Sequence, residues 1–204
     1  FQGGGGALDP AAAGGPLAGT VSTGSSSWTT YFTPEGTPVT LANAGDSLTV
    51  TWVFTPRTVN AGNTSQDFRL AVVDSPSAQR LAANGAPGSG LYAGYGMLMN
   101  MGPTLGNTNP FQLREHDGNG ALLSGSGDWL ALANGVASGA AGYASDTQYT
   151  YVMSLTRNAT NGLDIRSTMS GGNIGGTGSV AVSFTGPTAS FTFDTFSLRP
   201  SSAS

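Results

Sequence analysis

The clearest structural signal in the chain is the segment Gln148-Tyr-Thr-Tyr-Val-Met-Ser-Leu-Thr-Arg-Asn-Ala-Thr-Asn-Gly-Leu-Asp-Ile-Arg-Ser-Thr-Met169. Apolar and polar residues alternate along both of its halves, which is typical of strands that bury one face. Between the halves, Asn161 and Gly162 tolerate the positive φ angles that tight turns require. The segment therefore predicts an antiparallel hairpin of strands 148–157 and 163–169.

The same alternation recurs from Trp28 onward, in short runs separated by clusters of Gly, Asn, Asp, Pro and Ser. No segment has a sustained helical period of apolar residues. We therefore predict an all-β fold, a two-sheet antiparallel β-sandwich of the jelly-roll type. Besides the hairpin, the predicted strands are 28–32, 47–54, 68–73, 94–101, 111–116, 179–184 and 191–198.

A chain of 204 residues fits one domain, because sandwiches of this length have a single core. Residues 3–19 are almost entirely Gly, Ala and Pro with little to bury, which predicts a flexible linker. The opening Phe1-Gln2-Gly3 is typical of the residue left by a cleaved purification tag. We accordingly predict a tag remnant and linker at 1–19, the sandwich domain at 20–200 and a tail at 201–204.

The composition narrows the classes of partner. The formal charge is −4 and all seven basic residues are arginines without a basic cluster, so nucleic acid is not an expected partner. No apolar stretch approaches the roughly 18 residues of a membrane helix, so no membrane partner is expected. The absence of cysteine excludes disulfides and thiolate metal sites. Abundant Ser, Thr, Gly and Asn, together with the absence of lysine, favour a secreted, extracellular protein.

Several segments carry a family resemblance: Asp46-Ser-Leu-Thr-Val-Thr-Trp-Val-Phe54, Asp67-Phe-Arg-Leu-Ala-Val-Val-Asp-Ser75, Tyr95-Gly-Met-Leu-Met-Asn100, Phe111-Gln-Leu-Arg-Glu115, the hairpin, and Phe193-Asp-Thr-Phe-Ser-Leu198. They resemble the concanavalin A-like, laminin-G-like jelly-roll superfamily of secreted bacterial proteins, over most of the chain from Thr20 to Pro200. Similar stretches accompany pectate lyases and other polysaccharide-degrading or surface proteins. The resemblance implies a non-catalytic carbohydrate-binding module, tethered to a catalytic domain in the full-length protein.

The candidate ligand-binding residues share one predicted strand face. Alternation places Gln112, Arg114 and His116 together, with Arg69 and Asn100 on neighbouring strands. Jelly-roll polysaccharide lyases use a similar set, in which a cation or amide neutralises the uronate and a His or Tyr removes the α-proton.

Three interpretations of this face stay open. The first is a carbohydrate-binding module for a plant or microbial cell-wall polysaccharide, and it is favoured because histidine and glutamate are scarce. The second is a lyase acting on an acidic, uronate glycan, with Tyr95, Tyr149 or Tyr151 as the base. The third is a structural or adhesive surface domain, in which Arg69 and Arg114 merely pair with nearby acids.

Aromatic side chains are the other expected sugar contacts, because pyranose rings stack on them. Trp129 follows Gly127 and Asp128 in a predicted loop, and Tyr92 lies in a short glycine-flanked segment. We expect both rings to be exposed, although a core position for Trp129 stays open. Trp52 belongs to a regular apolar alternation and is expected in the core.

The sequence gives little support for a metal site or a hydrolase site. One histidine and no cysteine are too few ligands for a catalytic zinc, and no Gly-x-Ser-x-Gly elbow precedes a helix. The carboxyl pair Glu115 and Asp117 falls at a predicted turn and is a poor glycosidase pair. Asp117, Asn119 and Asp128 are candidates for a structural calcium, and no other cofactor is expected.

Overall fold

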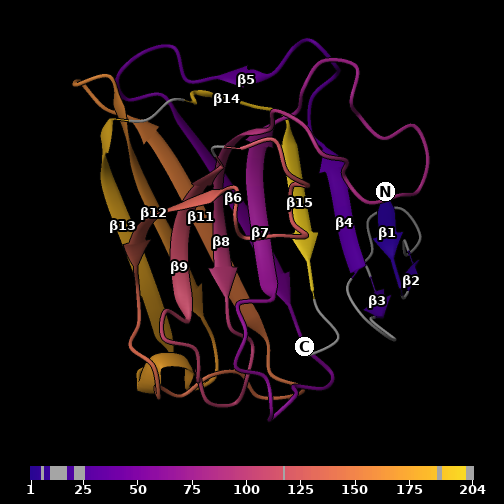
Figure 1. Ribbon diagram of the computed structural model, residues 1–204. Helices are drawn as coiled ribbons and strands as arrows, with labels where there is room; N and C mark the ends of the chain where they lie inside the picture. The colour runs from indigo at the N-terminus through magenta and orange to yellow at the C-terminus, as the bar shows by residue number, and fades with distance from the viewer. Residues whose placement is uncertain (6, 10–17, 21–25, 117, 188–189, 201–204) are drawn as a thin grey trace.

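Two antiparallel β-sheets stack face to face in the computed structural model, which describes residues 1–5, 7–9, 18–20, 26–116, 118–187 and 190–200 (Figure 1). The larger sheet has seven strands in the order β1-β4-β15-β7-β8-β9-β10. The smaller sheet has four, in the order β13-β12-β11-β6. The predicted all-β antiparallel sandwich is confirmed.

The larger sheet consists of β1 (Gln2–Gly4), β4 (Ser26–Tyr31), β15 (Thr195–Arg199), β7 (Phe68–Asp74), β8 (Ala93–Met99), β9 (Phe111–His116) and β10 (Trp129–Asn134). The smaller sheet consists of β13 (Ser179–Pro187), β12 (Gly162–Ser170), β11 (Tyr149–Arg157) and β6 (Ser47–Phe54). Two short pairs join β5 (Val39–Thr40) to β14 (Thr192–Phe193), and β2 (Ala7–Asp9) to β3 (Ala18–Thr20). The described residues include one 3₁₀ turn, Ile174–Gly176, and none of their helices is long and apolar enough to cross a membrane.

The predicted hairpin is confirmed as β11 and β12, which pair from Arg157 opposite Leu163 to Thr150 opposite Ser170. Asn161 has a φ of 58°, as its place in the turn requires. The side chain of Asn158 stabilises the turn, because its Oδ1 accepts hydrogen bonds from the amides of Thr160 and Gly162 at 3.0 and 2.9 Å.

The other predicted strands are also present, with differences at their ends. The segment predicted as one strand from 191 to 198 is divided at Asp194 into β14 and β15, which pair with different neighbours. Strand β10 was not predicted, because Trp129–Asn134 combines one apolar run with no clear alternation. Short strands such as β5 and β14 carry too few residues for a periodic signal.

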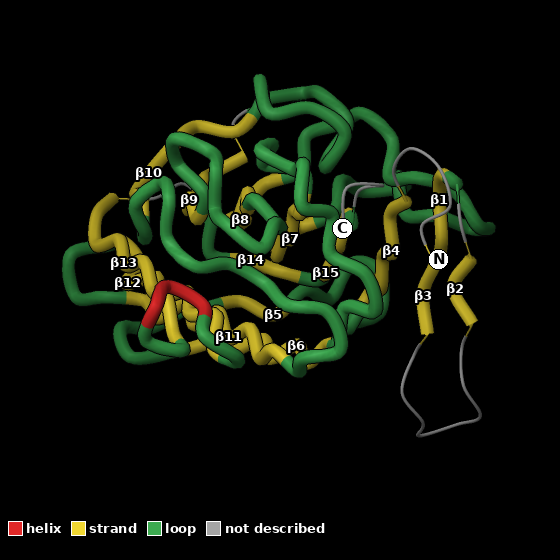
Figure 2. The backbone as a smooth tube through the Cα atoms, turned by 90° about the horizontal axis from the view of Figure 1, so that it is seen from below, coloured by secondary structure: helices red, strands yellow, loops and turns green. Residues whose placement is uncertain are grey.

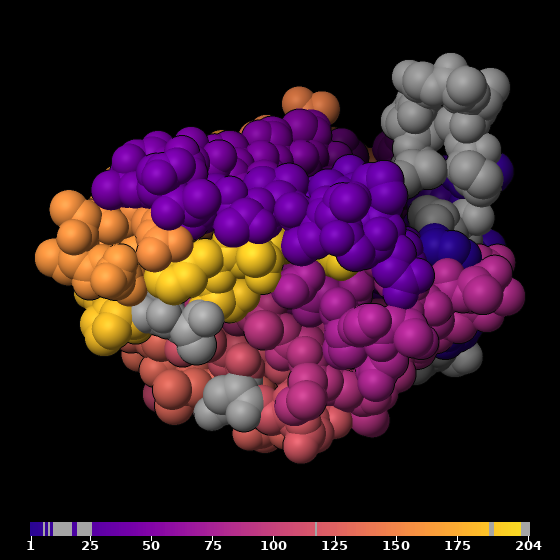
Figure 3. Space-filling view, turned by 90° about the horizontal axis from the view of Figure 1, so that it is seen from above, coloured from indigo at the N-terminus to yellow at the C-terminus, as the bar shows by residue number. Residues whose placement is uncertain are grey.

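Strands β5 and β14 close one end of the sandwich. The amide of Leu41 donates to the carbonyl oxygen of Phe191 at 2.9 Å, beside the two-residue β5–β14 ladder. Figure 3 looks onto this end and shows the segment around β5 lying next to the chain around β14. Leu41 and Phe193 are consequently buried at this end of the core.

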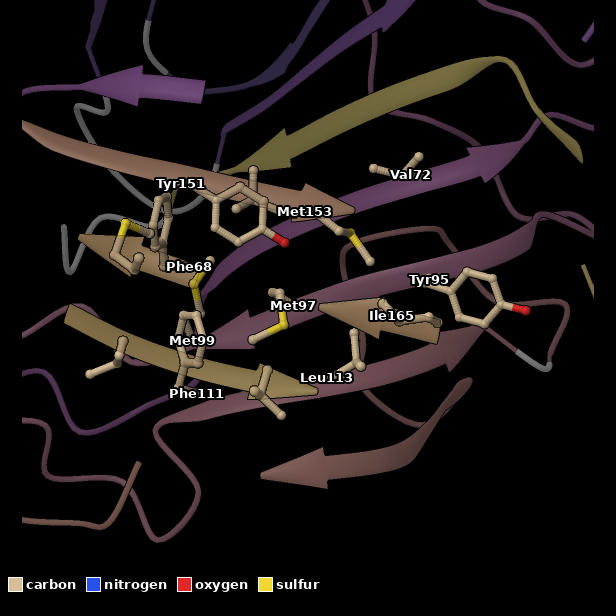
Figure 4. Packing of buried hydrophobic residues seen from close by; sticks show 14 of the residues in the cluster. Phe68, Val72, Tyr95, Met97, Met99, Phe111, Leu113, Tyr151, Met153 and Ile165 are labelled. Atoms are coloured by element: carbon tan, nitrogen blue, oxygen red, sulfur yellow. The ribbon is translucent and has the colours of Figure 1, made fainter. Parts of the chain in front are cut away.

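The core lies between the two sheets and is built from their alternating inward residues. Met97, Met99 and Leu113 of the larger sheet face Met153 and Ile165 of the smaller one (Figure 4). Each of these side chains is at most 1% exposed. Burial of apolar side chains of this size stabilises the fold by about 1.5–3 kcal/mol each before entropic costs.

The first residues of the chain are part of the larger sheet. Gln2–Gly4 forms β1 and pairs with Ser26–Trp28 of β4, although this segment was predicted to lie outside the domain. The terminal amino group of Phe1 donates to the carbonyl oxygen of Thr29 at 2.8 Å. The tail predicted at 201–204 and residues 10–17 of the predicted linker lie outside the described residues.

Replacement of a core leucine should destabilise the sandwich strongly. Leu155 is fully buried, opposite Leu48 and Ile165, so Leu155→Ala should lower the free energy of unfolding by about 2–5 kcal/mol. Thr156→Ala, on the outward face of the same strand, should cost less than about 1 kcal/mol. Urea denaturation followed by tryptophan fluorescence measures both, and equal losses would contradict the assigned faces.

Candidate functional site

The predicted polar residues share the outer face of the larger sheet. Gln112, Arg114 and His116 alternate along β9 with residues that point into the core. The strand register places Gln112 beside Leu98 on β8, and Leu98 beside Arg69 on β7. The alternation of the sequence therefore grouped these side chains correctly.

Two loops cover this outer face. Residues 75–92 and 118–128 lie over it and are joined by a β-bridge between Ser89 and Ala121. Between loops and sheet they bury a second apolar cluster of Ala71, Val73, Tyr92, Leu98, Leu122, Leu123 and Trp129. The polar residues consequently lie under the loops and do not form an open groove.

Arg114 is the centre of a hydrogen-bond network beneath these loops. Its Nε donates to Gln112 Oε1 at 2.7 Å, and its Nη2 donates to Gln66 Oε1 at 3.1 Å. Its Nη1 donates to the carbonyl oxygens of Trp129 at 3.0 Å and Ser126 at 3.3 Å. Because both ends of the guanidinium bind protein groups, Arg114 fastens the second loop to the sheet.

Arg69 and Asn100 bind the main chain of covering segments in the same way. Arg69 is 8% exposed, and it donates from Nε to the carbonyl oxygen of Gln66 at 2.9 Å and from Nη1 to that of Leu123 at 2.7 Å. Asn100 is fully buried, and its Nδ2 donates to the carbonyl oxygen of Asn63 at 3.0 Å. Both side chains thus satisfy carbonyl groups that would otherwise lack partners.

His116, Tyr92 and Trp129 form one buried cluster. The His116 ring meets the Trp129 ring edge to face at 4.9 Å and the Tyr92 ring at 6.4 Å. His116 Nδ1 lies 2.7 Å from the carbonyl oxygen of Tyr92, and Trp129 Nε1 donates to that of Leu122 at 2.9 Å. Tyr92 and Trp129 are each 3% exposed. The expectation that these two rings are exposed is wrong, because the loops enclose them. Trp129 has the core position that the sequence left open.

Gly96 explains how Trp129 fits against the sheet. A Cβ at position 96 would lie 2.8 Å from two carbons of the Trp129 ring, so the ring packs directly on the backbone of β8. A glycine inside a strand often marks such a close approach. Gly96 was therefore the signal in the sequence that something large covers this face.

A buried ion pair anchors the start of the first loop. Asp194 is 3% exposed, and its Oδ2 lies 2.6 Å from Arg80 Nη2. Ser75 donates to this carboxylate from its amide at 2.8 Å and its hydroxyl at 2.6 Å, and the Thr195 hydroxyl donates at 2.6 Å. Burial alone raises the pKa of Asp194, but these hydrogen bonds outweigh burial and hold the pKa below its ordinary range.

The tyrosines considered as a lyase base lie on the other side of the sheet. Tyr95, Tyr149 and Tyr151 are fully buried between the two sheets. Arg114 and His116 project from the opposite face of β9. These three tyrosines therefore do not share a site with Arg114 and His116.

The predicted calcium ligands are only partly described. Asp117 lies outside the described residues. Asn119 is exposed, and the carboxylate of Asp128 packs against the backbone of Gly118 and Gly120. Among the described residues, no group of three or more His, Asp or Glu side chains could hold a metal ion. A structural calcium at this turn stays a prediction.

A groove that the sequence did not predict runs beside β6, and we call it the β6 groove. The smaller sheet ends at β6, whereas β15, β4 and β1 continue the larger sheet on that side (Figure 2). Trp52 of β6 packs over Phe68 of β7 at 5.7 Å between ring centroids, so the strands beyond β7 have no facing strand. The resulting open space has a volume of about 600 Å³.

Aromatic rings line much of the β6 groove. Trp52 and Phe54 stack with their centroids 4.2 Å apart and their planes 7° from parallel. Phe68 lies below them, and Trp28 and Phe196 come from the strands that extend beyond β6. All except Phe68 are half-buried, so part of each ring borders the open space.

Hydroxyls and the guanidinium of Arg57 are among the polar side-chain groups that line the β6 groove. Thr30, Thr55 and Thr58 line it, together with Arg57. Arg57 pairs with Asp146 at 2.9 Å, but the two side chains are 84% and 67% exposed. Exposed ion pairs of this kind contribute little, so Arg57 is free to exchange its partner for a ligand.

From the sequence, Trp52 of the β6 groove was expected in the core. Alternation correctly placed Trp52 and Phe54 on the inward face of their strand. Whether an inward face is covered depends on how many strands the opposite sheet has. No local pattern encodes that number, so the sequence held no signal for the groove.

No protein-family model, curated protein or solved structure matches this chain. The resemblance to concanavalin A-like domains consequently stays a prediction.

Loss of the Arg114 side chain should act on stability first. Arg114→Ala leaves the carbonyl groups of Ser126 and Trp129 without their donor and should lower the free energy of unfolding by about 1–3 kcal/mol. Arg57→Ala removes an arginine side chain that is 84% exposed, so it should change the free energy of unfolding by less than about 0.5 kcal/mol. Urea denaturation measures the stability of both variants. An unchanged urea midpoint for Arg114→Ala would refute the structural role of Arg114.

The Asp194 ion pair should give the fold a component of acid sensitivity. Its lowered pKa means that the stability it contributes is present above the ordinary Asp pKa of about 4 and is lost as pH falls through the folded-state pKa. Asp194→Asn should therefore differ most from the wild type near neutral pH, and the difference should shrink as the pH falls below the ordinary Asp pKa and through the folded-state pKa. Thermal melts across pH measure this, with the exposed Asp146→Asn as the control; a difference independent of pH would contradict the assignment.

Proposed function

We propose that this protein is a non-catalytic carbohydrate-binding module, which holds a secreted protein on a plant or microbial cell-wall polysaccharide through the β6 groove. The observation that carries the proposal is an open groove of about 600 Å³ with aromatic side chains on both walls. Ligand sites are typically concave and apolar, with a few polar groups that set orientation. The resemblance of the chain to secreted jelly-roll modules points to the same class.

The lining chemistry matches that of a sugar ring. One face of a pyranose is apolar and stacks on aromatic rings, while its hydroxyls need hydrogen-bond partners at the rim. Trp28 and Phe196 on one side and Trp52 on the other supply the apolar surfaces, and Thr30 and Thr55 supply hydroxyls. Their arrangement along β4, β15 and β6 suits an extended chain of sugar units.

The same lining favours binding over a lyase reaction. A lyase needs a cation and a base near the same uronate. Among the described lining residues Arg57 is a cation, but neither a histidine nor a tyrosine accompanies it. A tethered module works well with weak binding, because attachment raises the local concentration of its partner domain near the polysaccharide.

Removal of an aromatic wall should weaken retention on a polysaccharide. In affinity gels containing pectin, xylan or soluble cellulose derivatives, Trp52→Ala should raise the Kd for the retained polymer at least about tenfold. Trp52→Phe keeps a stacking surface and should recover part of the affinity.

Leu91→Ala is the matched control, because Leu91 is 72% exposed and does not line the β6 groove. Circular dichroism verifies that each variant is folded. Equal retention of Trp52→Ala and wild type on every polymer, or retention of neither on any, would remove the support for this site.

A further inference from the structure

Strand β6 leaves one edge of the smaller sheet unpaired. Among the described strands it pairs with β11 alone, and Figure 2 shows it as the last strand of that sheet. Its length of eight residues exceeds the usual length of about five or six. An edge strand presents backbone N–H and C=O groups that no neighbouring strand binds. Such groups need another partner, which is water or a ligand.

Two hydrogen bonds show which residues of β6 turn these groups outward. In an antiparallel pair, alternate residues direct both N–H and C=O toward the partner strand, and the residues between them direct both away. The carbonyl oxygen of Asp46 accepts from the amide of Arg157 at 2.9 Å, and that of Pro56 accepts from the amide of Asp146 at 2.7 Å. The register of β6 on β11 has no shift between these two positions. The even-numbered residues of β6 therefore face β11, and the odd-numbered residues face the open edge.

Val53 is the odd-numbered residue of β6 that reaches the β6 groove. Residues 52–58 line the groove without interruption. Trp52 and Phe54 do so with their inward rings, whereas Val53 belongs to the outward face of the strand and is 50% exposed. Because its side chain points away from the space between the sheets, Val53 lines the groove through its main chain. Thr49 faces the same edge but does not line the groove.

The side chains that line the β6 groove carry little net charge. Among the described lining residues, Arg57 has the only charged side chain, and it pairs with Asp146 at 2.9 Å. A ligand carboxylate would compete with Asp146, and it could not bind the carbonyl oxygen of Val53 because a carboxylate only accepts hydrogen bonds. A hydroxyl both donates and accepts, so it matches the N–H and the C=O of Val53. The groove thus complements a neutral, hydroxyl-rich ligand.

We propose that the outward N–H and C=O groups of Val53 bind hydroxyls of a neutral polysaccharide, while one of its sugar rings stacks on Trp52. This inference rests on the proposed function of the β6 groove and names its ligand class, which is a neutral glycan rather than a uronate polymer. The two contacts come from consecutive residues, about 3.4 Å apart along the strand, so a single sugar unit can make both. Pairing with β11 fixes the main chain of Val53 before the ligand arrives, which lowers the entropic cost of binding.

Substitution by proline tests the N–H of Val53 directly. Val53→Pro removes this donor and breaks no hydrogen bond to β11, and edge strands tolerate proline where the N–H faces outward. In affinity gels of xylan or hydroxyethyl cellulose, we expect Val53→Pro to raise the Kd for the retained polymer at least about fivefold. Thr49→Pro is the matched control, because it alters the same edge away from the groove and should keep the wild-type Kd. Circular dichroism verifies that both variants are folded.

A measurement on the wild-type chain serves if Val53→Pro does not fold. The ¹⁵N-labelled protein is titrated with xylohexaose or cellohexaose, and the chemical shifts of its backbone amides are followed. The amide of Val53 should shift saturably, because its N–H gains an acceptor. The amide of Thr49 should stay in place.

Three results would overturn the proposal, and each bears differently on the β6 groove. Equal Kd values for Val53→Pro and Thr49→Pro, with an unmoved Val53 amide, would exclude the strand edge, while weaker retention of Trp52→Ala would still support the groove. Tighter retention on polygalacturonate than on the neutral polymers would exclude the neutral class and favour binding through Arg57. Retention of the wild type on no polymer would remove both the edge contact and the proposed function.

Discussion

Two sheets of unequal width must bury each other's apolar faces in this molecule. Four strands cover the larger sheet from β10 to about β7, where Trp52 of β6 packs on Phe68. Beyond that line, β15 and β4 still present inward residues such as Leu198 and Trp28, because alternation continues along every strand. The β6 groove is the direct consequence of this mismatch, and its aromatic walls are core residues without an opposite sheet.

The outer face of the larger sheet also carries apolar residues, but loops cover it in place of a third sheet. Ala71, Val73 and Leu98 are among the residues buried there. Loops bring main-chain polar groups into a buried place, and these groups need partners. Arg114 and Arg69 supply the donors, and Asp194 holds the first loop through Arg80. Polar side chains that suggested a ligand site from sequence therefore serve the packing of the loops.

The distribution of charge follows the same packing. A protein with few charged residues buries several of its arginines, and the acids do not match them one to one. Where hydrogen bonds to carbonyl oxygens satisfy an arginine, as for Arg114, the charge is structural. Arg69, which shares Asp67 with Arg199, likewise donates to the carbonyl oxygens of Gln66 and Leu123, so its charge is structural as well.

Local periodicity was sufficient to predict the strands, the β11–β12 hairpin and the common face of Gln112, Arg114 and His116, because side-chain direction in a strand depends only on neighbours two residues apart. It misplaced the exposure of Trp129 and Tyr92, since burial there depends on loops that fold back from other parts of the chain. Local patterns also could not predict the β6 groove beside Trp52, or that Asp67 lies near both Arg69 and Arg199. Sheet width, strand order and the meeting of distant charges are long-range properties, and only the tertiary structure decided them.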